Sequence, residues 1–196
     1  MSENVELQNE NMDGIKELFL FELDKELYAV SVEKVERVMK IPPITPVPNA
    51  PKAIVGIFHL QGKVVVVIDL INRMEMPKQK PLTASYLFVV QHAKDQFAIL
   101  IDKPRMMVRV PVSLIHAPDQ IIAAHVPPQY ISGVFMHQDA TSVAKRASIL
   151  IEAPRENTEN VLDFRNPPRP VLWLDLEKLL NQEDLAHIFT SQDQSL

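Results

Sequence analysis

The residues that could do chemistry are few, and their spacing favours no catalytic or metal-binding arrangement. The six histidines are scattered, and none lies three to five residues from another, the close spacing common in zinc sites. The chain has no cysteine, which excludes thiolate nucleophiles, disulfides and Cys-ligated metals. We therefore expect no catalytic residue, no metal ligand and no cofactor.

One segment, Gly56–Lys63, superficially resembles a phosphate-binding loop that ends in Gly-Lys. Five residues separate its glycines where the motif has four, and Val64 stands where the motif needs Ser or Thr. Apolar runs flank Gln61-Gly62-Lys63 on both sides, a pattern typical of a β-hairpin. The segment therefore predicts a turn between two strands rather than a nucleotide site.

The composition predicts a β-rich globular protein. Hydrophobic residues make up 46% of the chain and charged residues 23%, which is ordinary for a globular domain. Sixteen prolines fall between short apolar runs, as in Ile41–Pro48, and proline cannot lie inside a central strand. We therefore expect short strands joined by extended connectors.

Charge and hydropathy exclude several partner classes. The net charge of −5 argues against nucleic acid, because phosphate binding needs clustered Lys and Arg. No apolar run approaches the roughly 18 residues of a membrane span, so we expect no direct membrane insertion. The N-terminus lacks a signal-peptide pattern, and residues 1–15 predict a flexible acidic tail. These features predict a cytoplasmic protein.

The second half of the chain repeats the first. Leu18–Phe21 aligns with Leu87–Val90, and Tyr28–Val30 aligns with Phe97–Ile99 without a gap. The later matches need an insertion in the second copy, at about 137–169. The repeats predict one domain at 16–182, with a first copy at about 16–80 and a second at about 84–182. A C-terminal helix and tail are expected at 183–196.

Five residues are assigned structural roles. Asp69 and Asp175 follow apolar strands at equivalent positions of the two repeats, and a strand-end carboxylate can be either a general base or a helix cap. Because the aspartate recurs in both copies, capping is the favoured interpretation. Gly56 and Gly133 are likewise equivalent, and Gly62 lies in the expected hairpin turn.

The sequence resembles the CheW-like coupling domains of bacterial chemotaxis over roughly residues 16–182. The most specific part is the Pro-rich connector followed by a strand, Gly62, a second strand and Asp69-Leu70. The segments that carry the likeness are Phe19–Phe21, Tyr28–Val32, Val35–Val38, Ile44–Pro51, Val55–Leu70, Tyr130–Val134 and Leu174–Leu180.

The resemblance implies a mainly β fold of two five-stranded barrels that share a core, with short helices after the strand-end aspartates and a C-terminal helix. It also implies a non-catalytic adaptor in chemotaxis signal transduction. Such an adaptor couples the cytoplasmic tips of chemoreceptors to the regulatory domain of the histidine kinase CheA, through barrel-to-barrel contacts. Its expected location is the cytoplasm, in membrane-associated or polar arrays.

Two departures from the family pattern mark candidate partner-binding residues. The chain has His59-Leu60-Gln61-Gly62 where the family usually has Asn-Leu-Arg-Gly, and Glu36-Arg37 where it has a variable residue and Glu. In the family that Glu and Arg can pair and help shape the partner-binding face. Here Arg37 and Gln61 replace them, which exchanges a charge-assisted pair for a cation and an amide.

Four further partner-binding residues are expected from the apolar run Val64–Ile68. In a half-buried strand apolar and polar residues alternate, whereas this run is apolar throughout. We expect Val55, Ile57, Val64 and Val66 to form an exposed apolar patch that a second barrel covers. Val66 also stands where the family commonly has proline.

Two alternatives remain open. The departures at Arg37 and Gln61, with the insertion, favour an auxiliary CheW-fold protein of another chemosensory pathway, such as pilus motility or array positioning. A small-molecule sensor using a cleft between barrels is the third possibility, and no sequence feature requires it.

The paired Met106 and Met107 suit an adaptable contact surface, although core filling is the favoured interpretation.

Overall fold

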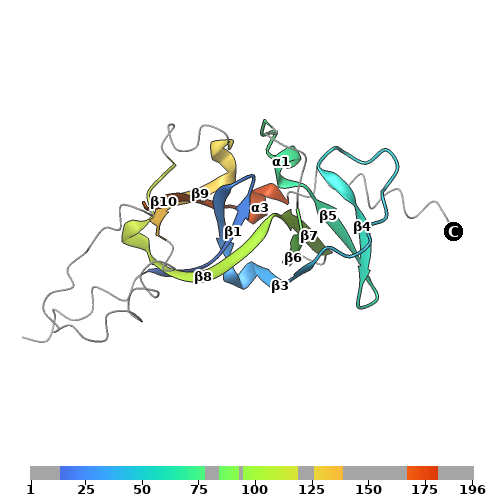
Figure 1. The fold of residues 1–196 in the computed structure, drawn as a ribbon, viewed down its shortest axis with the longest axis horizontal. Helices are drawn as coiled ribbons and strands as arrows, with labels where there is room; N and C mark the ends of the chain where they lie inside the picture. The colour runs from blue at the N-terminus through green and yellow to red at the C-terminus, as the bar shows by residue number, and fades with distance from the viewer. Residues whose placement is uncertain (1–13, 78–83, 93–94, 119–125, 139–166, 181–196) are drawn as a thin grey trace, which may run out of the picture.

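The computed structural model describes residues 14–77, 84–92, 95–118, 126–138 and 167–180, which hold ten strands and five short helical segments (Figure 1). The mainly β fold that the sequence predicted is confirmed. Residues 1–13 of the expected tail, 139–166 of the insertion and the C-terminal segment 183–196 lie outside the described residues. The strands are β1 (Ile15–Leu23), β2 (Glu26–Ser31), β3 (Val35–Lys40), β4 (Ile54–Leu60), β5 (Lys63–Ile68), β6 (Tyr86–His92), β7 (Asp95–Ile101), β8 (Lys103–Pro111), β9 (Ile131–His137) and β10 (Arg169–Leu174). The helical segments are η1 (Val32–Lys34), α1 (Leu70–Arg73), η2 (Val112–Leu114), η3 (Pro128–Tyr130) and α3 (Leu176–Leu179).

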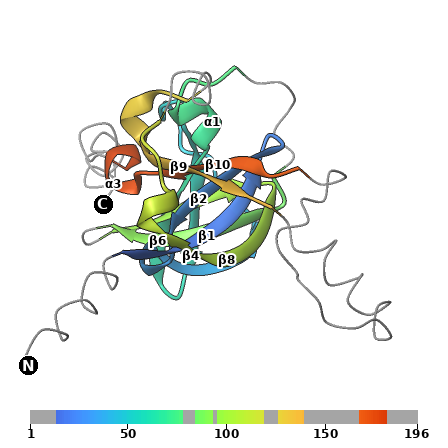
Figure 2. The same ribbon diagram turned by 90° about the vertical axis from the view of Figure 1, so that its left-hand side faces the viewer.

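The strands form two five-stranded sheets with the same internal order. The β1 sheet has the order β8-β1-β2-β10-β9, and the β6 sheet has the order β3-β6-β7-β5-β4. The orders become identical when β1–β5 are equated with β6–β10, so each sheet combines strands from both sequence repeats. The β1 sheet lies on the left of Figure 1 and the β6 sheet on the right, and Figure 2 views the molecule from the side of the β1 sheet.

The edges of each sheet are linked by a connector rather than by strand pairing. After β3 the chain crosses to β4, where Thr45 and Ile57 exchange two backbone hydrogen bonds of 2.8 Å. After β8 the chain reaches β9, where His116 and Val134 exchange bonds of 2.8 and 2.9 Å. Within the described residues the pairings do not close either sheet into a complete barrel.

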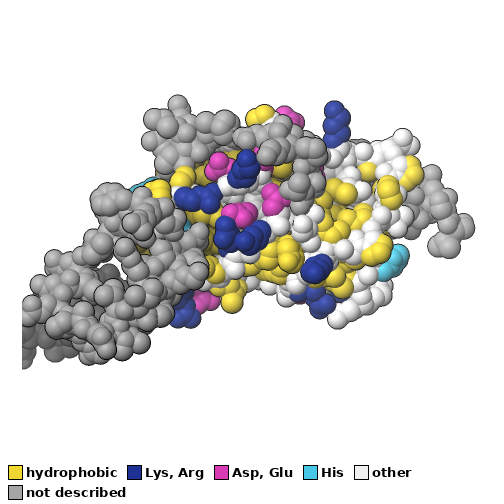
Figure 3. Space-filling view, viewed as in Figure 1, with side chains coloured by type: hydrophobic (Ala, Val, Ile, Leu, Met, Phe, Trp, Pro, Cys, Tyr) yellow, Lys and Arg dark blue, Asp and Glu magenta, His cyan; other side chains and the backbone are white. Residues whose placement is uncertain are grey.

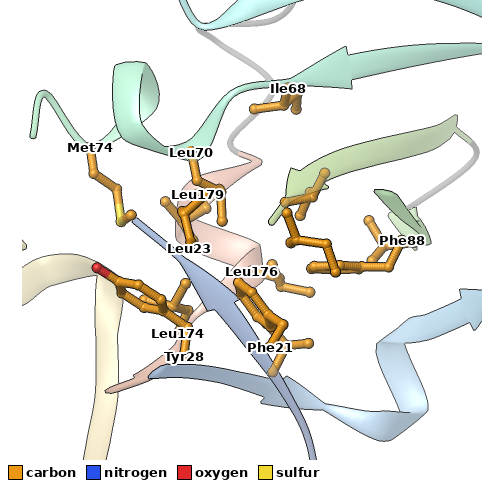
Figure 4. Close-up of a cluster of buried hydrophobic side chains, with 14 of the residues drawn as sticks. Phe21, Leu23, Tyr28, Ile68, Leu70, Met74, Phe88, Leu174, Leu176 and Leu179 are labelled. Carbon is orange, nitrogen blue, oxygen red and sulfur yellow. The ribbon is translucent and has the colours of Figure 1, made fainter. Parts of the chain in front are cut away.

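Alternating side chains of the strands divide the apolar interior into three clusters. The largest, between the two sheets, contains the stacked rings of Phe21 and Tyr28 together with Phe88 (Figure 4). A second cluster includes Leu18 and Leu20 of β1, and a third includes residues of β5, β6 and β7. Each sheet therefore covers a cluster of its own and also contributes to a shared core, as the resemblance implied.

The apolar run of β5 is explained by burial of both faces of this strand. Val65 and Val67 point into the cluster of the β6 sheet, and Val66 and Ile68 point into the shared core. All four side chains are at most 1% exposed. A strand covered on both faces is continuously apolar, because neither face meets water.

Each of the two short α-helices begins at a strand-end aspartate. The Asp69 carboxylate accepts hydrogen bonds from the backbone N–H groups of Ile71 and Asn72, at 2.9 and 3.2 Å. Asp175 accepts equivalent bonds at the start of α3, at 3.1 and 3.3 Å. The N–H groups in the first turn of a helix have no carbonyl partner within the helix. The aspartate oxygens supply that partner, so both carboxylates act as helix caps.

Glycines lie where the chain needs close backbone approach or a positive φ. Gly56 (φ +154°) faces the Thr45 carbonyl, and a Cβ there would lie 2.4 Å from its oxygen. A Cβ on the equivalent Gly133 would lie 2.4 Å from Ile115 of the second connector. Gly62 (φ +81°) follows Gln61 (φ +52°) in the β4–β5 turn, and two positive φ values in succession are typical of a tight hairpin.

Candidate interaction surfaces

The eight expected partner-binding residues all lie on the β6 sheet or its hairpin turn, but they do not form one patch. β3 carries two, β4 three, the β4–β5 turn one and β5 two. Their exposure ranges from open to fully buried. On these elements, in order, lie Glu36, Arg37, Val55, Ile57, His59, Gln61, Val64 and Val66.

The expectation for Val66 is wrong. Its side chain is 1% exposed and belongs to the core shared by the two sheets, so it is not part of an exposed apolar patch. The long apolar run that suggested an exposed patch instead reflects the burial of β5 on both faces. A charge at this position would enter the core rather than test an interface.

The other apolar candidates leave a narrow exposed strip on the hairpin. Val55 and Ile57 are half-buried against the apolar clusters, and the backbone of Ile57 pairs with the connector. Val64 is 37% exposed, next to the exposed Gln61 turn, and His59 is exposed on β4 opposite Val64. The hairpin end is therefore the part of this segment that a partner can reach.

Glu36 and Arg37 sit at an irregularity in the pairing of β3 with β6. The register shifts between Val35 and Arg37, so Glu36 is the extra residue of a β-bulge. Glu36 Oε2 accepts a hydrogen bond of 2.7 Å from the side-chain amide of Gln96, and Glu36 Oε1 lies 3.8 Å from Arg37 Nη2. The Glu36 carboxylate is thus shared between an amide and a more distant guanidinium.

Arg37 and Gln61 do not lie on neighbouring hydrogen-bonded strands. β3 and β4 are the two edges of the β6 sheet, with β6, β7 and β5 between them. Both views nevertheless place β3 and the tip of the β4–β5 hairpin along the lower side of the molecule (Figures 1 and 2). The strand that carries Arg37 and the turn that carries Gln61 are therefore separated by the width of the β6 sheet.

A second surface, which the sequence did not single out, follows β8 at the edge of the β1 sheet. A hollow of about 370 Å³ is lined by Val32, Met107 and Val108, with Glu17 and Arg109 in an ion pair of 2.8 Å beside them. Met107 is 70% exposed and Met106 is 41% exposed. The favoured interpretation of core filling is therefore wrong for this methionine pair, whereas Met74 is buried in the core.

A charged cluster joins the two sheets where the chain crosses between them. Lys34 of η1 and His92 of β6 both contact the Glu177 carboxylate at the start of α3, and the His92 Nδ1 to Glu177 Oε2 distance is 3.1 Å. The hydrogen bond from Lys34 holds the pKa of Glu177 below its ordinary value, and the same bond raises the pKa of Lys34. These contacts link η1, β6 and α3 at the surface of the protein.

The described parts of the chain hold neither a candidate metal site nor a membrane-spanning helix. No group of three or more His, Asp or Glu side chains there is arranged to hold a metal ion. None of the helices in those same ranges is long and apolar enough to cross a membrane. The segment Gly56–Lys63 forms the end of β4 and a tight turn, so it is not a phosphate-binding loop.

The pattern that defines the CheW-like domain matches residues 17–184, which include both sheets and both capped helices. The chain belongs to the CheW-like domain family. A search of curated proteins gave no match. Among solved structures, the chain is similar to the scaffolding protein TtCheW from Thermoanaerobacter tengcongensis, with a TM-score of 0.62 and 20% identity over 85% of this chain and 88% of that one.

Family membership decides the class of function at a coarse level. CheW-like domains form a family of non-catalytic scaffolds, which supports a scaffold or adaptor role in chemotaxis signalling for this chain. The likeness to TtCheW shows that the arrangement of the two sheets is that of the CheW fold.

Proposed function

We propose that this protein is a cytoplasmic adaptor that couples chemoreceptors to the histidine kinase CheA within chemosensory arrays. The observation that carries the proposal is the match of the CheW-like pattern to nearly the whole described fold, residues 17–184. An adaptor must hold two partners at once, so it needs two surfaces that do not overlap. The β3 and hairpin region and the β8 hollow meet this requirement, because they lie on the edges of different sheets.

The two surfaces differ in kind, which fits two unlike partners. The β8 hollow has an apolar floor beside an ion pair, and methionine side chains adapt readily to the shape of a partner. The β3 and hairpin region presents charged and amide side chains beside single valines. We propose that one surface holds the receptor tip and the other the CheA regulatory domain.

The proposal is tested with purified full-length protein, a receptor cytoplasmic fragment and the CheA regulatory domain of the same organism. Calorimetry measures each binary affinity, and sedimentation velocity measures whether one chain carries both partners. Met107→Glu should weaken one partner and Val64→Glu the other, because both side chains are exposed and tolerate a charge. Failure to bind either partner, or competition of both for one surface, contradicts the proposal.

A second candidate role is an auxiliary protein of another chemosensory pathway, such as one that controls pilus motility or array position. The observation that favours it is the presence of Arg37 and Gln61 where the family usually has Glu and Arg. Under this role the protein binds the kinase of the second pathway more tightly than CheA. Parallel calorimetry with the two regulatory domains separates the candidates.

A further inference from the structure

The methionines of the described fold divide into an exposed set and a covered set. Met107 is 70% exposed, Met136 is 55% exposed and Met106 is 41% exposed, whereas Met74 is 1% exposed in the shared core. The chain has no cysteine, so methionine is its only sulfur-containing side chain. The exposed set is therefore where a dissolved oxidant reaches sulfur in the part of the chain that the structure describes.

The exposure of the methionine pair in β8 follows from the geometry of this strand. The pairing of β1 with β8 skips one residue of β8 between Met107 and Pro104, which is a β-bulge. The extra residue interrupts the alternation of the two faces, and Met106 and Met107 are both exposed although they are consecutive. β8 is also an edge strand, hydrogen-bonded to β1 on one side only. The fold therefore holds both thioethers at the surface.

Met107 differs from the other exposed methionines in its surroundings. It lines the hollow of about 370 Å³ beside β8, together with Val32 and Val108. Met106 and Met136 are not among the residues that line this hollow. In Figure 3, hydrophobic side chains lie beside β8, below the charged side chains at the centre of the view. A protein that docks in the hollow would therefore cover the Met107 side chain with apolar contacts.

Oxidation would change the chemistry of this side chain from apolar to polar. With hydrogen peroxide as the oxidant, the sulfur lone pair attacks one peroxide oxygen, an S–O bond forms and the O–O bond breaks. The leaving hydroxide takes the proton of the transferred oxygen, which gives the sulfoxide and water. Sulfur loses the two electrons that the peroxide gains. A partner that covers the sulfoxide oxygen without a hydrogen-bond donor binds less tightly, because a polar group is buried unpaired.

We propose that Met107 is a site of reversible oxidation by peroxide, at which the sulfoxide weakens the binding of the partner that docks in the β8 hollow. The effect on binding rests on the proposed adaptor function, whereas the selectivity of oxidation depends on the fold alone. Methionine sulfoxide reductases reverse the change. Two thiols supply the electrons for this step and leave as a disulfide, and the sulfoxide oxygen leaves as water.

The first arm of the test does not depend on the adaptor role. The full chain is treated with increasing hydrogen peroxide, and peptide mapping by mass spectrometry follows each methionine separately. Met107 should oxidise roughly tenfold faster than Met74 or more, because susceptibility follows exposure. Met76 should also lag, since its sulfur accepts a hydrogen bond of 3.9 Å from the Tyr28 hydroxyl. Circular dichroism should remain that of the folded protein. Oxidation of Met107 no faster than that of Met74 overturns the proposal.

The second arm measures binding of the CheA regulatory domain and the receptor fragment by calorimetry. Peroxide treatment of the natural protein should weaken one of the two roughly tenfold, the factor expected for an unpaired polar group in an apolar contact. The two classes of methionine sulfoxide reductase, one for each sulfoxide epimer, should restore the affinity together with dithiothreitol. Met107→Leu should bind normally before and after peroxide, and Met107→Gln should bind weakly without it. The matched control is Met136→Leu, which should respond to peroxide as the natural protein does.

The variants also separate failure of the switch from failure of the adaptor function. Equal loss of affinity in the natural protein and in Met107→Leu would assign the effect to another methionine and overturn the proposal. Unchanged affinity for both partners after Met107 has been oxidised would overturn it as well. If neither partner binds before oxidation, the adaptor function fails, and selective, reductase-reversible oxidation of Met107 still supports the modification site.

Discussion

Replacing Gly56 with alanine should destabilise the protein more than the same change at Gly62, although both glycines have a positive φ. An alanine Cβ at position 56 would lie 2.4 Å from the Thr45 carbonyl oxygen and 2.6 Å from Ile44 Cγ2. At position 62 no atom lies within 4 Å of the added Cβ. Because a backbone carbonyl cannot rotate away as a flexible side chain can, the Thr45 connector must move off β4.

The size of the effect follows from the contacts that this movement breaks. Thr45 and Ile57 exchange two backbone hydrogen bonds, each of about 0.5–1.5 kcal/mol net. A non-glycine residue at φ +154° adds about 1–3 kcal/mol of backbone strain. Gly56→Ala should therefore cost about 2–6 kcal/mol, whereas Gly62→Ala carries only the strain of a positive φ, about 1–2 kcal/mol.

Urea unfolding followed by circular dichroism measures both changes as free energies of unfolding. Hydrogen exchange of the Ile57 amide gives a local readout, because its acceptor is the Thr45 carbonyl. Gly56→Ala should speed exchange at this amide, and Gly62→Ala should not. Equal losses of stability in the two variants, with an unchanged Ile57 amide, would refute the close-approach argument.

Three further outcomes are expected. Val66→Asp should unfold the protein or cost several kcal/mol, because it buries a charge in the shared core, whereas Val64→Asp should stay folded; thermal denaturation separates them. Asp69→Ala should cost about 2 kcal/mol in urea unfolding, because a 3%-exposed cap is lost from α1. The stabilisation from Glu177 should be present at neutral pH and be lost as the pH falls through its lowered folded pKa. That from Lys34 should be lost as the pH rises through its raised folded pKa. NMR titration of the natural protein and of Glu177→Gln checks both limbs, and an unchanged Lys34 titration in the variant would contradict the pairing.

Local rules were sufficient to predict features that depend on a few consecutive residues. The aspartates at positions 69 and 175 could be recognised as caps because a cap needs only a carboxylate and the next three N–H groups. The hairpin turn at Gly62 was visible from its flanking apolar runs. The repeated glycines could be aligned, but the reason for them, a connector that crosses the adjacent strand, depends on residues far apart in the sequence.

Burial could not be predicted where both faces of a strand are apolar. The run containing Val64 and Val66 has the same residue type throughout, yet one side chain is 37% exposed and the other 1%. The difference arises because Val64 lies in the hairpin beyond the end of β7, whose pairing with β5 begins at Val65. Met107 was misjudged for the related reason that no described element covers the outer face of the edge strand β8.

The two docking surfaces proposed for this chain derive from one duplicated edge. Phe19 of β1 pairs with Met107 on β8, and the equivalent Phe88 of β6 pairs with Val38 on β3, so Met107 and Val38 occupy equivalent positions. Around Met107 the neighbouring arginines are bound to carboxylates of the same chain, whereas beside Val38 the guanidinium of Arg37 makes no hydrogen bond in the described structure. Each sheet takes strands from both halves of the chain, so the exchange of strands between the repeats connects both edges to the shared core. Duplication followed by divergence of side chains at these edges can therefore give a scaffold two unlike partners without any change of fold.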